Sequence, residues 1–216
     1  MANILSGVGV LDKAVTILAA LESGPRPLAD LVTATGLSRA TTHRLAVALE
    51  AHGLVRRDEA GRFALGLRLI GLGHAAAEAL PGWLVARPAL AWLAEQTGES
   101  VQLFVRDGDE RVCVESLEAP HELRTIVPVG ARLPLDRGSG GRALADPPAS
   151  GGWVASVAER QPGVASVSAP VVDRAGRVVA AVSVSGPIDR LTRAPGRRHG
   201  PAVAEAAQRI ASALSS

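Results

Sequence analysis

The sequence predicts an α+β protein, in which a helical N-terminal part is followed by a part built from antiparallel strands and further helices. Apolar residues recur at helical spacing up to residue 52, and glycine or proline interrupts that spacing. Between residues 99 and 185, short runs rich in Val and Ser flank turns that contain Asp and Gly, which is typical of hairpins. Since 47% of the 216 residues are hydrophobic and 20% are charged, the chain can bury one large core or two small ones.

Three helices and one strand pair are expected within the first 66 residues. The helices are separated by breaks at Gly24-Pro25 and Gly36, and the third helix ends at Gly53. The expected strands and the turn between them are 54–57, 62–65 and 58–61. Three helices followed by a hairpin in about 60 residues form the pattern of a winged helix-turn-helix.

The third helix, with Ser38 as its N-cap, is expected to bury one face and expose the other. The predicted core face comprises Thr41, Leu45, Ala48, Leu49 and His52. The exposed part starts at the helix N-terminus, which is the part of a recognition helix that meets base edges. Arginine pairs with guanine, hydroxyl groups suit bases or phosphates, and arginines of the hairpin suit phosphates. The predicted DNA-contacting residues, which include Thr41 again, are Ser38, Arg39, Thr41, Thr42, His43, Arg44, Arg56, Arg57 and Arg62.

A linker helix is expected over residues 67–80, between a first domain at 1–66 and a second domain at 81–216. The second domain begins and ends with a helix and has antiparallel strands between them, which is an α+β arrangement. Its expected helices are 83–96 and about 201–214. Its expected strands are 99–106, 111–117, 123–129, 164–172 and 177–185.

Serines alternate along the last two expected strands. Ser166 and Ser168 share one face of the first strand, and Ser183 and Ser185 share one face of the second. Pairing of these strands would gather the hydroxyl groups on one side of the sheet, as either a small polar pocket or an ordinary polar outer face. The glycine-rich loop at residues 138–141 could supply backbone N–H donors for a carboxylate in such a pocket.

The sequence lacks the motifs of catalytic and metal sites. The five histidines have no zinc-ligand spacing, and no acid–base or nucleophile set surrounds Ser139. We therefore expect no catalytic residue, no metal and no cofactor. The single Cys113 excludes an internal disulfide, which allows a reducing cytoplasm, and no apolar run is long enough for a membrane span. We expect a cytoplasmic protein without a membrane partner.

A sequence-specific DNA-binding regulator without enzymatic activity is the favoured interpretation of this pattern. One alternative is a small-molecule-binding enzyme that uses the helix-turn-helix as an interaction module, and the missing acid–base set argues against it. Another alternative is a helix-turn-helix that contacts only proteins. Operator binding in a gel-shift assay separates that alternative from the favoured interpretation.

Several stretches of the chain resemble the IclR family of bacterial transcriptional regulators, and the resemblance covers nearly the whole chain. The winged-helix stretch is Gly36-Leu37-Ser38-Arg39-Ala40-Thr41-Thr42-His43-Arg44-Leu45, and the stretches in the second domain are 162–171 and 178–187. More narrowly, residues 6–14 and 190–197 resemble the NdgR-like branch. That branch consists of actinobacterial regulators associated with amino-acid metabolism, notably leucine biosynthesis.

The resemblance implies a homodimer, or a tetramer formed as a dimer of dimers, that binds a palindromic double-stranded operator. We expect the linker helix and the first helix to hold the dimer together. The resemblance also implies a GAF-like C-terminal domain that binds a small-molecule effector, such as an amino acid or a small carboxylate. The residues that match the family's effector contacts are Gly138, Ser139, Gly140, Ser166, Ser183 and Ser185.

Two departures from the family pattern bear on this effector site. Many relatives carry cysteine where this chain has Ser166, which implies a different ligand. Relatives also carry further helical sequence, which covers the pocket, where this chain has only residues 145–152. Because a pocket left open to water desolvates its ligand poorly, we expect weak affinity or a lost site.

Overall fold

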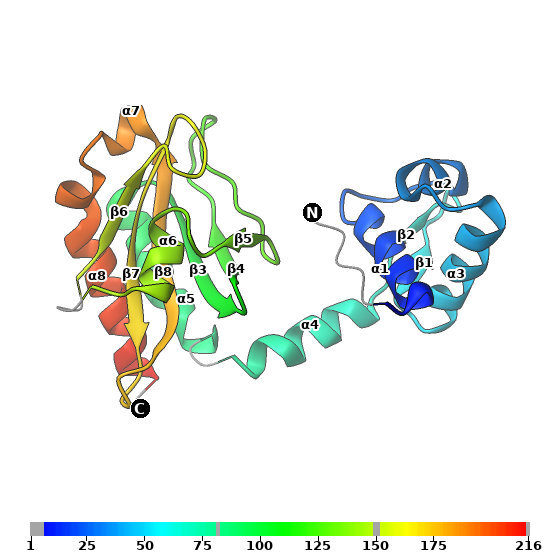
Figure 1. The fold of residues 1–216 in the computed structure, drawn as a ribbon, viewed down its shortest axis with the longest axis horizontal. Helices are drawn as coiled ribbons and strands as arrows, with labels where there is room; N and C mark the ends of the chain where they lie inside the picture. The colour runs from blue at the N-terminus through cyan, green and yellow to red at the C-terminus, as the bar shows by residue number, and fades with distance from the viewer. Residues whose placement is uncertain (1–6, 81–82, 149–151, 215–216) are drawn as a thin grey trace. The chain divides into compact units, whose positions relative to one another are not determined.

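The computed structural model describes residues 7–80, 83–148 and 152–214, and the chain forms two compact units, Met1–Ala76 and Ala77–Ser216 (Figure 1). Each unit packs around apolar core residues of its own. The α+β class predicted from the sequence is confirmed, because the first unit is a helix-turn-helix with a hairpin and the second contains an antiparallel sheet.

The first unit contains the three helices and the hairpin that the sequence predicts. Its elements are α1 (Gly9–Leu21), α2 (Leu28–Thr35), α3 (Arg39–Ala51), β1 (Val55–Arg57) and β2 (Phe63–Leu65). Between α2 and α3, Gly36 has a left-handed backbone (φ +67°), where a residue with a Cβ atom would be strained. Ile17, Leu31 and Phe63 are almost fully buried together, so the helices and the hairpin share one core.

The face of α3 that meets this core agrees only in part with the predicted one, since Leu45 and Leu49 pack in the core as expected. The buried residues are Thr42, Ala46 and Leu49, whereas Ala48 and His52 are exposed. The prediction was wrong for Ala48 and His52, because two possible core faces, one residue apart, run along this helix and share Leu49. Alanine is small enough to lie on either face, so the sequence pattern did not distinguish the two stripes.

Helix α4 (Arg68–Glu78) occupies most of the range expected for the linker helix, and none of its residues is buried. Arg68 Nη1 donates a hydrogen bond to the backbone carbonyl of His52 at 3.1 Å, which fixes the start of the helix. Ile70 and Leu72 expose large apolar side chains, as does Leu67 just before the helix. Within the described ranges, α4 therefore contributes an apolar surface rather than part of a core.

The second unit is built on a six-stranded antiparallel sheet with the strand order β5-β4-β3-β8-β7-β6. Two long helices, α5 and α8, cover one face of this sheet, and the short helix α6 packs against the other face (Figure 1). The strands are β3 (Ser100–Asp107), β4 (Glu110–Leu117), β5 (Arg132–Pro134), β6 (Val154–Val157), β7 (Val164–Val172) and β8 (Val178–Pro187). The helices are α5 (Trp83–Thr97), α6 (Ser139–Ala145), α7 (Ile188–Leu191) and α8 (Pro195–Ala213).

Apolar and polar side chains alternate along the central strands, so one face of the sheet is apolar and the other is polar. Leu103, Val182 and Val184 join the hydrophobic core beneath α5 and α8. Because side chains alternate along a strand, Gln102 and Ser183 point to the α6 face. Both polar residues are almost fully buried, so this is an enclosed polar layer and not a solvated outer face.

The strand expected at residues 123–129 does not form. Backbone pairing with β4 begins only at Gly130, whose N–H donates to the carbonyl of Cys113 at 2.7 Å. The short strand β5 takes the position beside β4 instead.

The structure also differs from the sequence prediction at the start of α8 and in three short elements. Helix α8 begins at Pro195 and not near Pro201, which lies inside the helix. Proline suits the first helical position, and the sequence offers two candidates for it. The elements β6, α6 and α7 were not predicted, because runs of four, seven and four residues are too short to display a period.

Candidate functional site

The first turns of α3 present an exposed polar surface. Ser38 caps the helix, since its Oγ accepts a hydrogen bond from the Thr41 N–H at 3.3 Å and donates one to the Thr41 hydroxyl at 3.0 Å. Arg39, His43 and Arg44 lie exposed along the following turns, as predicted. Neither arginine has an ion-pair partner among the described residues, so both guanidinium groups are available to a ligand.

Thr42 does not belong to this surface. Its side chain is fully buried, and its hydroxyl donates a hydrogen bond to the Ser38 carbonyl at 3.0 Å. Placing it among the DNA contacts was wrong, because the actual packing of α3 turns this position into the core. Thr42 stabilises the first turn of the helix.

The three arginines predicted at the hairpin are exposed, but two of them have carboxylate partners. Arg57 pairs with Glu50 at 3.4 Å, and Arg62 pairs with Asp58 at 2.7 Å. The backbone N–H of Arg62 also donates to Asp58 and lowers the pKa of that carboxyl. Arg56 has no ion pair within the described ranges, which leaves it the most open of the three to a phosphate.

A cavity of about 30 Å³ lies on the α6 face of the sheet in the second unit. Strand pairing creates its polar floor. Ser166 on β7 lies opposite Ser185 on β8, while Ser183 on β8 lies opposite Ser168 on β7 and Gln102 on β3. Three neighbouring strands therefore direct hydroxyl and amide groups toward one small space.

Five of the six predicted effector contacts line this cavity, from the loop before α6 and from strands β7 and β8. They are Gly138, Gly140, Ser166, Ser183 and Ser185. The sixth, Ser139, is fully buried beside them, with its Oγ 2.7 Å from the Ser166 Oγ and 2.8 Å from the Ser168 Oγ. Ser139 therefore positions the other serines.

Hydrogen bonds link these hydroxyl groups into a network. Ser168 donates to Ser183 at 2.9 Å, and Ser185 donates to Oε1 of Gln102 at 3.0 Å. The Nε2 of Gln102 is buried and has no hydrogen-bond partner among the described residues. An unpaired donor in a buried position costs free energy, and a ligand that supplies an acceptor recovers it.

Arg111 on β4 also lines the cavity, and the sequence analysis missed it. Only 3% of its surface is exposed. Its guanidinium carbon lies 5.3 Å from the centroid of the Phe104 ring, and Nη1 donates to the carbonyls of Pro134 and, at 2.8 Å, Arg137. Burial and the nearby charge of Arg160 lower the pKa of Arg111 to about 10, so the side chain stays charged at neutral pH.

One pattern in the sequence could have identified Arg111. Arg111 lies two residues before Cys113 on the same strand, so the two side chains point to the same face of the sheet. Because Cys113 is a small apolar residue that is expected in a core, Arg111 is expected to point inward as well. Gln102, Ser156 and Arg160 also line the cavity and were not predicted. Gln102 lies within an apolar strand, whereas Ser156 and Arg160 belong to a segment for which the sequence predicted no element.

The composition of the cavity favours an anion. The described residues that line it include two arginines but no Asp, Glu, His or Cys. The Gly138 N–H, predicted as a donor to a ligand carboxylate, instead donates to Oε2 of Glu159 at 3.1 Å.

Across residues 7–80, 83–148 and 152–214, no group of three His, Cys, Asp or Glu is placed to hold a metal ion. In the same residues, no helix is long and apolar enough to cross a membrane.

Two domain families match the chain. The IclR helix-turn-helix domain matches residues 10–59, and the bacterial transcriptional regulator IclR C-terminal domain matches residues 75–150 and 149–212. The second match is split into two pieces, and the break falls within the 145–152 connection that the family resemblance indicates to be short.

Individual relatives are similar over different shares of the chain. The HTH-type transcriptional regulator KipR of Bacillus subtilis is 34% identical over 117 residues, which are 54% of this chain and only 47% of that protein. The glycerol operon regulatory protein of Streptomyces griseus is 31% identical over 220 residues, which cover 84% of this chain and 85% of that protein.

A solved structure shares the fold. It is an IclR homologue from Microbacterium hydrocarbonoxydans, complexed with 4-hydroxybenzoate, and it matches with a TM-score of 0.78 at 22% identity. The match covers 95% of this chain and 99% of that chain. Because the two family domains account for most of the sequence, the chain belongs to the IclR family of DNA-binding bacterial transcriptional regulators.

Proposed function

We propose that the chain acts without enzymatic activity and binds a palindromic double-stranded operator through the exposed face of α3. The observation that carries this proposal is the pair Arg39 and Arg44, whose charges are unpaired within the described residues, at the start of a capped helix. In a helix-turn-helix, that part of the second helix enters the major groove. The proposed contacts are Ser38, Arg39, Thr41, His43 and Arg44 on α3, and Arg56, Arg57 and Arg62 on the hairpin.

We infer that the regulator works as a homodimer or as a dimer of dimers. A palindromic operator needs two recognition helices at a fixed spacing, and a single chain supplies one. Support comes from exposed apolar side chains on two helices, because soluble monomers rarely expose extended apolar patches. These side chains are Val10, Leu11 and Val15 on α1, and Leu67, Ile70 and Leu72 at and within α4.

We propose further that residues 1–66 bind DNA and that residues 81–216 sense a small metabolite. Residues 67–80 form the linker between these two domains. The arginines and unpaired donors of the cavity support an amino acid or a small carboxylate as its ligand. The homologue complexed with 4-hydroxybenzoate provides an example of a carboxylate bound by this fold. The resemblance of residues 6–14 and 190–197 to the NdgR-like branch favours a role in amino-acid metabolism.

Selection of genomic DNA fragments by the purified protein tests operator binding. We expect the recovered fragments to share a palindrome whose half-sites lie about one helical turn, or ~34 Å, apart. Nuclease footprinting then measures the protected length on each fragment. Recovery of no fragment above the non-specific background at physiological salt would contradict the proposal.

Thermal unfolding with leucine and with 4-methyl-2-oxopentanoate tests the sensing function. A ligand that binds only the folded protein raises the unfolding temperature, and the size of the rise reports the affinity. The double variant Ser183→Ala/Ser185→Ala should lose any such rise. If the rise persists unchanged in the double variant, these serines do not belong to the site.

A further inference from the structure

One pocket away from the serine-lined cavity lies where α7 and the first turns of α8 meet the segment that joins α5 to β3 (Figure 1). None of the described residues that line it also lines the serine-lined cavity. We call it the α7–α8 pocket, and its lining includes Glu99, Asp189, Arg190, Arg198 and His199. Every described residue of its lining is polar or charged, so we expect a polar ligand.

Glu99 and Arg190 neutralise each other in this pocket. Nε of Arg190 donates to Oε1 of Glu99 at 2.6 Å, and Nη2 donates to Oε2 at 2.9 Å. The Glu99 side chain is only 5% exposed, and Gly186 makes room for it, because a Cβ atom at that position would overlap Oε2. Two parallel hydrogen bonds between charged groups are strong and fix the geometry. Arg190 therefore holds the Glu99 carboxylate, which is not open to a ligand.

Asp189 and Arg198 are the two charges that remain. Both residues are exposed, and the ion pairs found among the described residues include neither of them. Nη1 of Arg198 donates to the backbone carbonyl of Arg190 at 3.2 Å. The pocket thus presents a carboxylate and a guanidinium group that do not pair with each other. A ligand with one charge would leave the like charge of the pocket beside it, whereas a zwitterion can pair with both.

His199 adds an unpaired polar atom from the interior. The residue is 5% exposed, and its Nε2 is buried without a hydrogen-bond partner in the described part of the chain. Burial and the charge of Arg198 lower the pKa of His199, so the ring is neutral at neutral pH. Because buried polar atoms are almost always paired in folded proteins, this nitrogen marks a position for a ligand atom. His199 lies within reach of the Arg198 charge, so one carboxylate can contact both side chains.

We propose that the α7–α8 pocket binds a free α-amino acid with a small or polar side chain, such as glycine or serine. Its carboxylate accepts hydrogen bonds from Arg198 and from Nε2 of His199, and its ammonium group pairs with Asp189. An amino acid this small binds at roughly millimolar concentration, since each heavy atom contributes a limited free energy. The inference goes beyond the proposed sensing function, because it gives the regulator a second small-molecule site outside the serine-lined cavity.

A saturation-transfer NMR titration of the full chain with glycine, acetate and methylammonium chloride tests the proposal. Acetate carries only the carboxylate and methylammonium carries only the ammonium group, so each should bind about tenfold more weakly than glycine. Serine should bind at least as tightly as glycine. Leucine should bind no more tightly than glycine, because no apolar residue among those described lines the pocket.

Single substitutions assign the two ends of the ligand. Arg198→Gln should weaken glycine binding about tenfold, whereas Arg197→Gln makes the same change in net charge at the preceding exposed residue, outside the pocket, and should leave binding unchanged. Asp189→Asn should weaken the binding of glycine but not that of acetate, which has no ammonium group. Arg198 and Asp189 are exposed, so both variants should fold.

His199→Leu gives a readout of opposite signs. Leucine has a similar volume and lacks the ring nitrogens, so the variant should bind glycine more weakly. Its unfolding temperature without ligand should be equal to or higher than that of the wild type, because an unpaired buried polar atom destabilises the free protein.

The inference is overturned if glycine binds no more tightly than acetate does, if Arg198→Gln and Arg197→Gln bind glycine equally, or if Asp189→Asn binds it as the wild type does. The double variant Ser183→Ala/Ser185→Ala should bind glycine as the wild type does. Loss of glycine binding in that variant would overturn the inference and place the amino acid in the serine-lined cavity. Glycine binding that persists while leucine and 4-methyl-2-oxopentanoate have no effect would support the α7–α8 pocket and contradict the proposed sensing function.

Discussion

At the scale of single residues, Arg44 and Arg62 show why exposure alone does not identify a DNA contact. Both are exposed, but Arg62 is paired with Asp58 at 2.7 Å, whereas Arg44 has no ion pair among the described residues. Binding a phosphate or base with Arg62 first requires separation from that carboxylate. Arg44 bears no such cost, and it lies near the start of the helix that would enter the groove.

Arg44→Ala should therefore weaken operator binding by about 1–3 kcal/mol without changing the unfolding temperature, because the side chain is exposed and unpaired within the described ranges. Fluorescence anisotropy with operator DNA at physiological salt measures the loss. Arg174→Ala is the matched control, since it removes the same charge from an exposed turn of the second unit. Equal affinities of Arg44→Ala and Arg174→Ala would remove Arg44 from the interface.

Thr42 provides the opposite case, a polar residue near the exposed face that belongs to the core. Thr42→Val keeps the shape of the side chain and removes the hydroxyl that bonds the Ser38 carbonyl at 3.0 Å. We expect the free energy of unfolding to fall by about 1 kcal/mol, while operator affinity of the folded variant stays unchanged. Urea unfolding and anisotropy measure the two quantities. A loss of affinity at unchanged stability would restore Thr42 as a DNA contact.

The residues of the cavity show which parts of a binding site can be predicted from a sequence and which cannot. The alternation of Ser166 with Ser168 and of Ser183 with Ser185 was visible, because a strand has a period of two residues. Arg111 was not found, since an arginine in a hairpin is usually exposed and its burial depends on α6 closing over it. Its position two residues before Cys113 is a local signal for burial, but only the long-range packing of α6 shows that an arginine is enclosed there.

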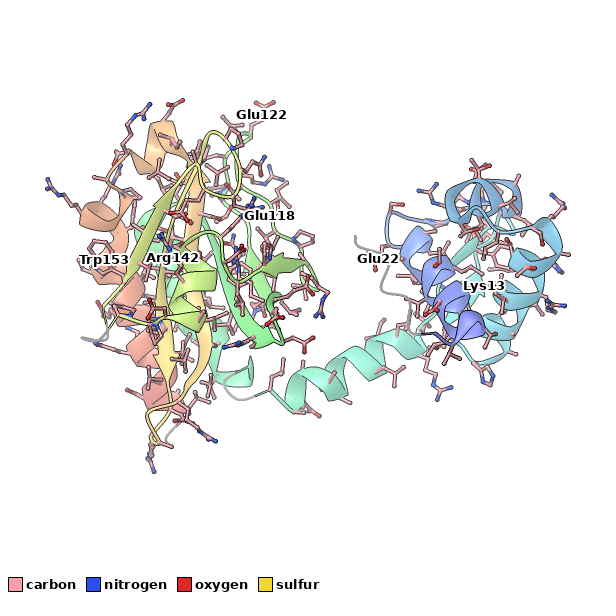
Figure 2. All side chains as sticks on the ribbon, in the orientation of Figure 1. Lys13, Glu22, Glu118, Glu122, Arg142 and Trp153 are labelled. Atoms are coloured by element: carbon pink, nitrogen blue, oxygen red, sulfur yellow. The ribbon has the colours of Figure 1, made fainter. Side chains whose placement is uncertain are left out.

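At the scale of elements, Trp153, just before β6, lies against α8, as Figure 2 shows on the labelled side chain. Two glycines, Gly196 and Gly200, stand one helical turn apart on α8, and a Cβ atom at either would overlap the indole ring. The tryptophan therefore packs into a notch that only glycine leaves open. This contact anchors the chain just after the 145–152 connection.

Gly200→Ala should destabilise the protein by about 1–3 kcal/mol, because the added methyl group overpacks the contact with Trp153. Helix propensity alone predicts the opposite, since alanine favours a helix over glycine by about 1 kcal/mol. Gly73→Ala in α4 is the matched control, because that glycine has open space around its Cβ position and should gain stability. Urea unfolding distinguishes the signs, and stabilisation by both substitutions would show that the notch tolerates a methyl group.

Elements with a long and regular period were predictable, and short or interrupted ones were not. Strand β7 forms over the predicted residues 164–172, and α2 ends at the predicted Gly36. The strand expected at 123–129 does not form, although its apolar alternation is visible, because its backbone makes no ladder with β4. A pattern of side chains thus predicts a strand only where the backbone can also pair.

At the scale of the whole molecule, the chain forms two units with separate cores. The first contains one helix-turn-helix, and the second contains the serine-lined cavity on the α6 face of its sheet. A palindromic operator has two half-sites, so one chain of this architecture can occupy only half of it. Assembly is therefore part of the proposed DNA-binding function, and the exposed apolar side chains of α1 and α4 are the candidates for it.

Ile70→Glu combined with Leu72→Glu should convert a dimer into a monomer. Both side chains are exposed, at 69% and 50%, so the substitutions cost little stability within one chain, but burial of two carboxylates in an apolar interface is unfavourable. Light scattering at micromolar concentration should give the mass of two chains for the wild type and of one chain for the variant. Leu123→Glu, at a residue 69% exposed in the second unit, is the matched control and should remain dimeric.

The same variants connect assembly to function. A monomer that keeps an intact α3 should still bind a single half-site, but it should lose the extra affinity that a dimer gains when its second recognition helix binds at high effective concentration. Anisotropy with half-site and full palindromic DNA measures that difference. A wild type that is monomeric by light scattering, or a variant that binds the full palindrome as tightly as the wild type does, would contradict assembly through α4.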